Sequence, residues 1–184
     1  MSSGNPFRWR LVSIRRSAAS RFVVAAMVAS CAALGFASAM KPRPLLVWNA
    51  SGSVPIGFYS VASTGQPKRG DLLLVRLPEG ARTLASDRRY LPSDKPAIKQ
   101  VAAAKGDVAC ASDGAIYING RRRADALRRD SQGRLLRSWR GCLRLADDQI
   151  FLLNDAPASF DGRYFGPSSS GDVIGILTPL CTFP

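Results

Sequence analysis

Two serines and one lysine are the residues of this sequence best suited to chemistry. Ser51 and Ser53 lie in a bend in which Gly52 permits unusual backbone geometry and Pro55 fixes its own φ. Lys99 lies inside the otherwise apolar run 97–103. Burial disfavours a lysine ammonium and lowers its pKa, so a buried lysine can take a proton from a serine hydroxyl. The alternatives are an ordinary turn that contains serines and a strand-edge lysine whose amine reaches water.

The absence of histidine narrows the possible reactions. The 184 residues include no histidine, which excludes Ser-His-Asp and Cys-His catalysis and nearly all zinc sites built on imidazole. A serine nucleophile must then use a lysine, a carboxylate or an amine as its base. The other lysines flank prolines, glycines or charged residues and are expected to be solvated; they are Lys41, Lys68, Lys95 and Lys105.

The N-terminal segment predicts a membrane helix. Residues 1–21 carry five arginines and no acidic residue, and residues 22–40 contain no charge. A run of this length can span a bilayer, and the arginines before it place the N-terminus in the cytoplasm. The uncharged run is longer than the usual core of a signal peptide, which favours an uncleaved anchor, although cleavage after Ala37-Ser38-Ala39 stays an alternative. In both cases residues 41–184 are exported.

The exported part is predicted to be mainly β. Short apolar runs alternate with Gly and Pro turns, and we expect strands at 45–48, 57–62, 72–75, 108–110, 149–153 and 172–177, with a hairpin at 115–120. Residues 78–97 are expected to form a loop or lid with one helical turn at most. The arginine-rich stretch of about 121–144 is interpreted as a surface excursion inserted in the β scaffold.

The cysteines are compatible with export. Cys31 lies in the apolar segment and is interpreted as a small apolar filler. Cys110, Cys142 and Cys181 allow three pairings, of which we expect Cys110–Cys142, because an oxidising compartment permits a disulfide.

Four segments in the same order resemble the signal peptidase I family, and within it the TraF-type peptidases of conjugative transfer systems. The segments are the serine box 51–59, the run 69–75, residues 98–101 leading to Gly106-Asp107, and the run 159–167 with the letters SFDGRYFGP. Gln100 and Lys105 stand where the housekeeping branch has Arg and Pro. The resemblance implies a signal-peptidase-like, β-rich catalytic domain behind one N-terminal transmembrane helix.

The resemblance also implies roles for individual residues. Ser53 matches the nucleophile and Lys99 the general base. Ser51 resembles the hydroxyl that completes an oxyanion hole with the backbone N–H of Ser53. Ser159 matches the hydroxyl that orients the lysine amine, and Asp161 and Arg163 match a buried ion pair that shapes the site.

By resemblance, the chain is expected to be a serine endopeptidase that matures an exported precursor, in this branch a conjugative pilin, with cyclisation in some systems. No cofactor or metal is expected, and the location is the bacterial inner membrane with the catalytic domain in the periplasm. The alternatives are a housekeeping-like signal peptidase for secreted preproteins, a non-catalytic pilus-assembly scaffold and a soluble self-cleaving repressor.

The strong positive charge suggests an anionic partner. The net charge of +13 suits a membrane surface or a nucleic acid. Between residues 121 and 144 Trp139 is the only tryptophan, so a base-stacking surface is not favoured. We therefore expect anionic lipids or the substrate precursor as partners of the arginines, and no nucleic acid.

Overall fold

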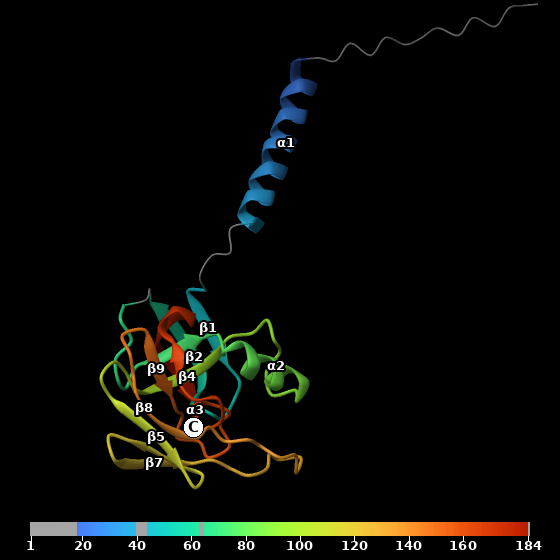
Figure 1. Cartoon of the computed structure of the whole chain (residues 1–184). Coiled ribbons are helices and arrows are strands. Elements are labelled where there is room, and N and C mark those ends of the chain that lie inside the picture. Colours follow the sequence, from blue (N-terminus) through green and yellow to red (C-terminus); the bar gives the residue numbers. More distant parts are fainter. Residues whose placement is uncertain (1–17, 40–43, 63–64, 184) are drawn as a thin grey trace, which may run out of the picture. The chain divides into compact units, whose positions relative to one another are not determined.

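The structure is a computed structural model that describes residues 18–39, 44–62 and 65–183. These residues form two compact units, divided between residues 42 and 43. The first unit contains α1 (Ala18–Ala39), a helix of 22 residues whose stretch Ala19–Ala37 is long and apolar enough to cross a membrane (Figure 1). The predicted apolar helix is thus confirmed, while residues 1–17 and Met40 lie outside the described part.

The second unit is built on two antiparallel sheets. Within the described residues, a seven-stranded sheet has the order β1-β2-β11-β3-β4-β9-β10 and a four-stranded sheet has the order β7-β6-β5-β8. The larger sheet contains β1 (Leu46–Asn49), β2 (Ile56–Ala62), β3 (Leu72–Val75), β4 (Ala97–Ala103), β9 (Gln149–Leu152), β10 (Ser168–Ser169) and β11 (Val173–Phe183). The smaller contains β5 (Val108–Ser112), β6 (Ala115–Ile118), β7 (Arg121–Asp125) and β8 (Gly141–Arg144). The prediction of a mainly β fold is confirmed.

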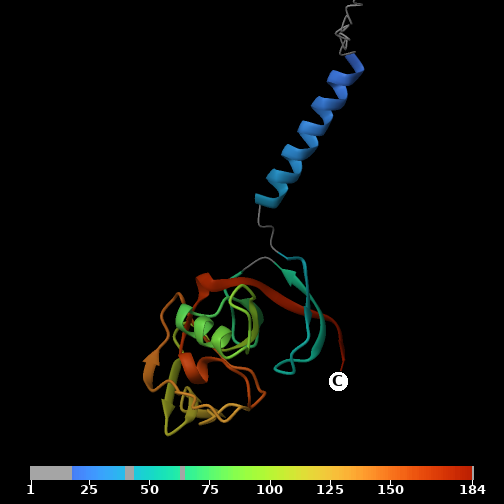
Figure 2. The same cartoon turned by 90° about the vertical axis from the view of Figure 1, so that its right-hand side faces the viewer.

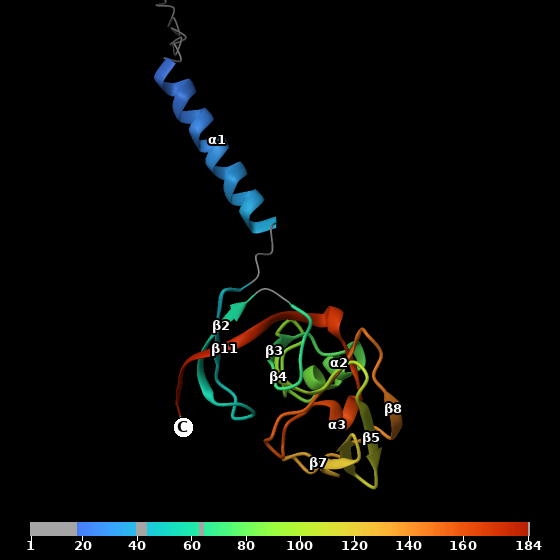
Figure 3. The same cartoon turned by 90° about the vertical axis from the view of Figure 1, so that its left-hand side faces the viewer.

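The long last strand joins the hairpin of β1 and β2 to the rest of the larger sheet. β11 pairs with β2 along one edge and with β3 along the other. The hairpin lies beside β11 at one side of the unit, with the four-stranded sheet at the other (Figures 2 and 3). Gly57 is required in this arrangement, because a Cβ atom there would lie 2.1 Å from the Cys181 carbonyl oxygen and its φ is +154°.

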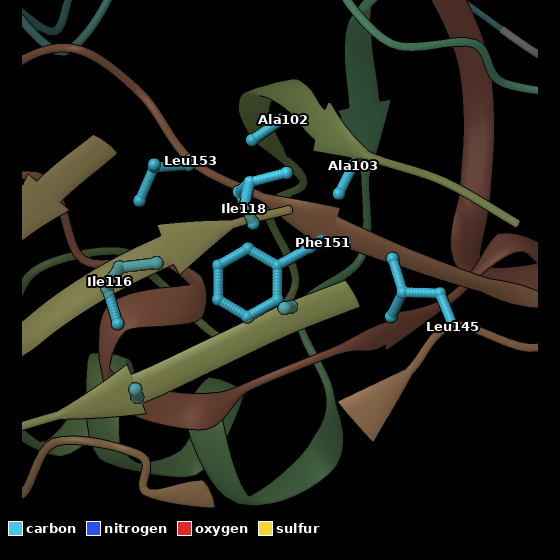
Figure 4. Packing of buried hydrophobic residues seen from close by; sticks show 9 residues of the cluster. Ala102, Ala103, Ile116, Ile118, Leu145, Phe151 and Leu153 are labelled. Atoms are coloured by element: carbon cyan, nitrogen blue, oxygen red, sulfur yellow. The ribbon is translucent and has the colours of Figure 1, made fainter. Parts of the chain in front are cut away.

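The two sheets are held together by an apolar cluster around Phe151. This side chain from β9 is fully buried and packs against Ile116 and Ile118 of β6, with Leu145 beside it (Figure 4). Burying one such phenylalanine contributes about 1.5–3 kcal/mol of stability. The disulfide between Cys110 and Cys142 links β5 to β8 in the same region, as expected from the sequence.

The described residues of this unit also form three short helical segments: α2 (Glu79–Asp87), α3 (Gly162–Phe165) and a 3₁₀ turn η1 (Ser170–Asp172). The expected single helical turn within 78–97 is an underestimate, because α2 has nine residues. Its Ala81 and Ala85 pack with Leu77 and Ala97 in one apolar cluster.

The interpretation of 121–144 as a surface excursion is correct only for the middle of the stretch. Its ends are β7 and β8, which pair with β6 and β5 respectively. Only residues 126–140 lie outside the named strands. These strands are difficult to predict from the sequence, because the stretch is rich in arginine and has no apolar periodicity.

Candidate active site

Asn49 organises the loop that carries the two serines. Its side-chain N–H groups donate to the carbonyl oxygens of Ser51, Val54 and Pro55 at 2.8, 3.1 and 3.0 Å. Its Oδ1 accepts from the backbone N–H of Ser51 at 3.1 Å. Asn49 is buried, and these partly buried bonds together hold the loop between β1 and β2 in one shape. Asn49 is not among the predicted site residues, although asparagine before a Gly and Pro turn is a known signal for such side-chain bonding.

The two serine hydroxyls are in contact. Ser51 Oγ lies 3.2 Å from Ser53 Oγ and donates to Asn49 Oδ1 at 2.9 Å. A hydroxyl has a single proton. When the Ser51 proton is directed to Asn49, the bond between the serines must be donated by Ser53.

Lys99 is held by the strand that carries it and by one neighbouring asparagine. The residue lies in the middle of β4, opposite Leu73 of β3. Asn154 accepts from the backbone N–H of Gln100 at 2.9 Å and donates to the carbonyl of Ile98 at 3.2 Å. These bonds fix the backbone on both sides of Lys99. Asn154 is thus a second positioning residue that the sequence did not reveal.

The Lys99 amine is buried. The residue is 6% exposed, and its Nζ donates to Ser159 Oγ at 2.9 Å. The alternative of a strand-edge lysine that reaches water is therefore wrong. Burial lowers the pKa of Lys99 to about 8, with smaller effects from the Asp161 carboxylate, which raises it, and the Arg163 guanidinium, which lowers it.

Asp161 and Arg163 form a buried ion pair beside this lysine. Arg163 Nε lies 3.4 Å from Asp161 Oδ1, and both side chains are almost fully buried. Burial raises the pKa of Asp161, while the charges of Arg163 and Lys99 and the hydrogen bonds from Asn154 and Ser159 oppose the rise. The Asp161 carboxylate also accepts from the backbone N–H of Arg163 and so caps α3.

Arg163 also ties down the loop that precedes Ser159. Its guanidinium donates to the carbonyl oxygens of Ala156 and Pro157 at 2.9 and 2.8 Å and to that of Asn154. A single ammonium in place of the guanidinium could not satisfy three carbonyls in this planar arrangement. The pair thus determines where the Ser159 hydroxyl meets the lysine.

The candidate site residues surround one cleft of about 710 Å³. Ser51, Ser53, Lys99 and Ser159 all line it, whereas Asp161 and Arg163 are buried behind its wall. Most of the other lining residues are apolar; they include Val47, Leu74, Leu77, Ala85, Ala97 and Ile98. Within the described residues no hydrogen bond joins Ser53 to Lys99. A serine hydroxyl and a buried amine in one mostly apolar cleft are suited to acyl transfer.

The chain matches one known protein family over most of its length. The family model described as signal peptidase, peptidase S26, matches residues 15–180. This chain belongs to that family. The resemblance found in the sequence is confirmed, and the chain is a serine peptidase of the signal peptidase type.

Several relatives of this chain have names that refer to plasmid or conjugal transfer. Two plasmid transfer proteins TraF of Escherichia coli are 28% identical over 145 residues (73% of this chain and 82% of the relative) and 26% identical over 180 residues (92% and 98%). A conjugal transfer protein TraF of Agrobacterium fabrum is 31% identical over 145 residues (73% and 81%). Among solved structures, a signal peptidase I of Enterococcus faecalis is 22% identical with a TM-score of 0.39, covering 63% of this chain and all of its own.

Proposed function

We propose that this chain is a membrane-anchored serine endopeptidase that uses Ser53 as nucleophile and Lys99 as general base to mature an exported precursor. The observation that carries the proposal is the buried Lys99 amine, bonded to Ser159 in the cleft that Ser53 also lines. The similarity to TraF transfer proteins favours a conjugative pilin as the precursor and a role in conjugal transfer.

The pKa of Lys99 supports its role as the base. At pH 7 a lysine with its ordinary pKa is neutral in about one molecule in 3,000. With a pKa of about 8, the neutral fraction becomes roughly one-tenth. The gain in neutral amine is about 300-fold, which is comparable with the rate contribution of a positioned base.

The reaction would proceed through an acyl-enzyme. Ser53 Oγ attacks the scissile carbonyl as its proton moves to Lys99 Nζ, and the carbon–nitrogen bond then breaks as the lysine ammonium protonates the leaving amine. Water, deprotonated by Lys99, attacks the ester and releases the acid. An amine of the precursor in place of water would give a cyclic product.

Ser51 is the proposed donor to the oxyanion, together with the backbone N–H of Ser53. In the free protein the Ser51 hydroxyl donates to Asn49, so the Ser51 proton has to turn from Asn49 toward the substrate oxygen during the reaction. Donors that stabilise an oxyanion in this way are each worth about 10²–10³ in rate. Asp161 and Arg163 would act by holding Ser159 in place.

The apolar helix and the charge distribution of the sequence support a proposed membrane organisation. Residues 1–21 lie in the cytoplasm, residues 22–40 span the inner membrane and residues 41–184 form the periplasmic peptidase domain, with a basic insert at about 121–144. Arg121, Arg123, Arg128, Arg137 and Arg140 of that stretch are exposed and make no ion pair within the described part of the chain. We assign them to anionic lipid head groups. Salt-reversible binding to oligonucleotides, with none to anionic liposomes, would contradict that assignment.

Co-expression with candidate pilin precursors from the same gene neighbourhood tests the function. We expect the parent and a Ser60→Ala control, which changes a serine of β2 outside the cleft, to convert the precursor to a smaller mass. Neither Ser53→Ala nor Lys99→Ala should do so. A product lighter by one water than the linear form would show cyclisation, and processing that survives Ser53→Ala would overturn the assignment.

If none of these versions processes a pilin, secreted preproteins are tested with the same variants. Processing of preproteins alone would replace the pilin proposal with a housekeeping-like role. Failure on both classes, with the variants folded, would favour the scaffold alternative.

A further inference from the structure

The middle of the arginine-rich stretch forms one wall of the cleft. Leu127, Asp130, Ser131 and Leu136 line the same cleft as Ser53 and Lys99. We call residues 127–136 the wall loop. It closes on itself as a tight turn, since Arg129 bridges to Leu135 and the backbone N–H of Leu136 donates to the carbonyl of Arg128 at 2.9 Å.

A buried carboxylate fixes the shape of the wall loop. The Asp130 side chain is 6% exposed and lies 2.7 Å from Arg134 Nε. It also accepts from the Tyr90 hydroxyl and, at 2.9 Å each, from the backbone N–H groups of Gln132 and Arg134. Arg88, just after α2, donates to the carbonyl of Leu135 at 2.9 Å. The wall loop is therefore held against the α2 region and has a defined surface toward the cleft.

An aromatic group connects the wall loop to the lysine site. Phe160 contacts the ring of Tyr90 at 5.4 Å and stacks on Tyr164 at 5.5 Å between centroids. The Tyr90 hydroxyl bonds to Asp130, and the Tyr164 hydroxyl accepts from the backbone N–H of Leu127 at 3.1 Å. Phe160 directly follows Ser159, the partner of Lys99. The aromatic rings that contact the wall loop therefore also contact the residue next to Ser159.

We propose that Leu127 and Leu136 form an apolar subsite that binds an aliphatic side chain of the substrate polypeptide, and that the wall loop thereby determines specificity. The inference rests on the proposed function, because it takes the polypeptide cleaved at Ser53 as the occupant. Leu127 is 41% exposed in the free protein, and covering such a side chain in a mostly apolar cleft favours binding. Leu135 of the same loop is 64% exposed and does not line the cleft, so it provides a matched control.

The test uses the full chain in detergent micelles and labelled decapeptides that share one small-residue cleavage sequence. Each peptide carries a single leucine, or alanine in its place, at one of the remaining positions. We expect the parent to prefer leucine at one position through a lower KM. Leu127→Ala and Leu136→Ala should each reduce that preference about tenfold with little change in kcat, since one lost aliphatic contact is worth this much. Leu135→Ala should keep the parent's preference.

The outcomes separate the subsite from the catalytic proposal. A parent with no leucine preference, or wall-loop variants that keep it, would overturn the subsite while leaving catalysis at Ser53 intact. Absence of cleavage by the parent would count against the proposed function alone. Fluorescence anisotropy of the same peptides then tests the subsite by binding alone. The subsite is supported if binding depends on the leucine, and if Leu127→Ala weakens this binding while Leu135→Ala does not. Any other pattern of binding, or no binding, overturns it.

Discussion

Lys99 Nζ donates a 2.9 Å hydrogen bond to Ser159 Oγ at a position where only 6% of the lysine is exposed. The lysine comes from β4, whereas Ser159 comes from the loop before α3, sixty residues further along the chain. Asn154, which bonds on both sides of Lys99, begins that loop, and Arg163 ties down its carbonyls. The lysine and its partner are therefore positioned by one connected set of buried polar groups.

The first prediction concerns pH. Because the base must be neutral, and burial lowers the pKa of Lys99 to about 8, kcat/KM should rise with pH and level off above a midpoint near 8. The direction follows from the proposed mechanism, in which the lysine that is protonated below this pKa cannot accept the proton of Ser53. The measurement is the pH dependence of peptide cleavage between about pH 6 and 10, a range that spans the shifted and the ordinary lysine pKa. An activity that continues to rise to the upper end of that range, as for a solvated lysine, would contradict the burial of the base.

The second prediction concerns Ser159. Ser159→Ala removes the hydroxyl that orients the amine but leaves the cleft otherwise intact. We expect kcat to fall by about 10² with KM nearly unchanged, within the range for a positioned base. Ser159→Thr retains a hydroxyl and should recover part of the loss. An alanine variant as active as the parent would show that the lysine needs no such partner.

The third prediction concerns the buried ion pair. Asp161→Asn leaves the Arg163 guanidinium buried without its counter-charge, and removing one partner of a buried pair costs about 3–5 kcal/mol. Denaturant unfolding of the full chain in detergent measures the change. Asp155→Asn alters an exposed carboxylate in the same loop and should change the unfolding free energy by less than about 0.5 kcal/mol. Equal stabilities of the two variants would contradict a structural role for the pair.

The fourth prediction concerns the disulfide. Cys110 and Cys142 are 32 residues apart in sequence, and releasing a loop of this length costs about 3–4 kcal/mol in the chain-entropy description. Replacing both by serine should lower the unfolding free energy by this order. Cys181→Ser, at an exposed free cysteine, is the control. An unchanged stability of the double variant would mean that the sheet of β5 to β8 holds without the bond.

Local sequence patterns predicted much of the fold. The run 72–75 led directly to β3, and the Asn119-Gly120 turn marked the end of β6, because apolar runs between turn residues have few alternatives to strands. The strand after that turn, β7, was missed within the arginine-rich stretch. The helix α2 was missed beyond one turn. It begins after Pro78 without a side-chain cap and has a mostly polar composition, so its stability depends on packing of Ala81 and Ala85 in the folded unit.

The roles of the two asparagines could not be predicted in the same way. Asn49 and Asn154 act through hydrogen bonds to backbone groups of their own loop or of a distant strand. Neither contact has a periodic signature, and the partners of Asn154 on β4 are 54 and 56 residues away. The residues matched by family resemblance, Ser53 and Lys99, both line the cleft. The proposed subsite, in contrast, lies in a loop that the sequence marked only as part of an arginine-rich stretch.

The most direct test asks whether Lys99 acts on residue 53. A Ser53→Cys variant, made with Cys31→Ser and Cys181→Ser to remove the free exposed thiols, is alkylated with iodoacetamide across about pH 5 to 10, with and without Lys99→Met. An ammonium beside the thiol favours the thiolate. We expect the thiol introduced at position 53 to have an apparent pKa at least about one unit below the ordinary value of about 8.5 when Lys99 is present, and close to that value when Lys99 is replaced. Identical alkylation profiles in the two proteins would contradict a Ser53–Lys99 dyad.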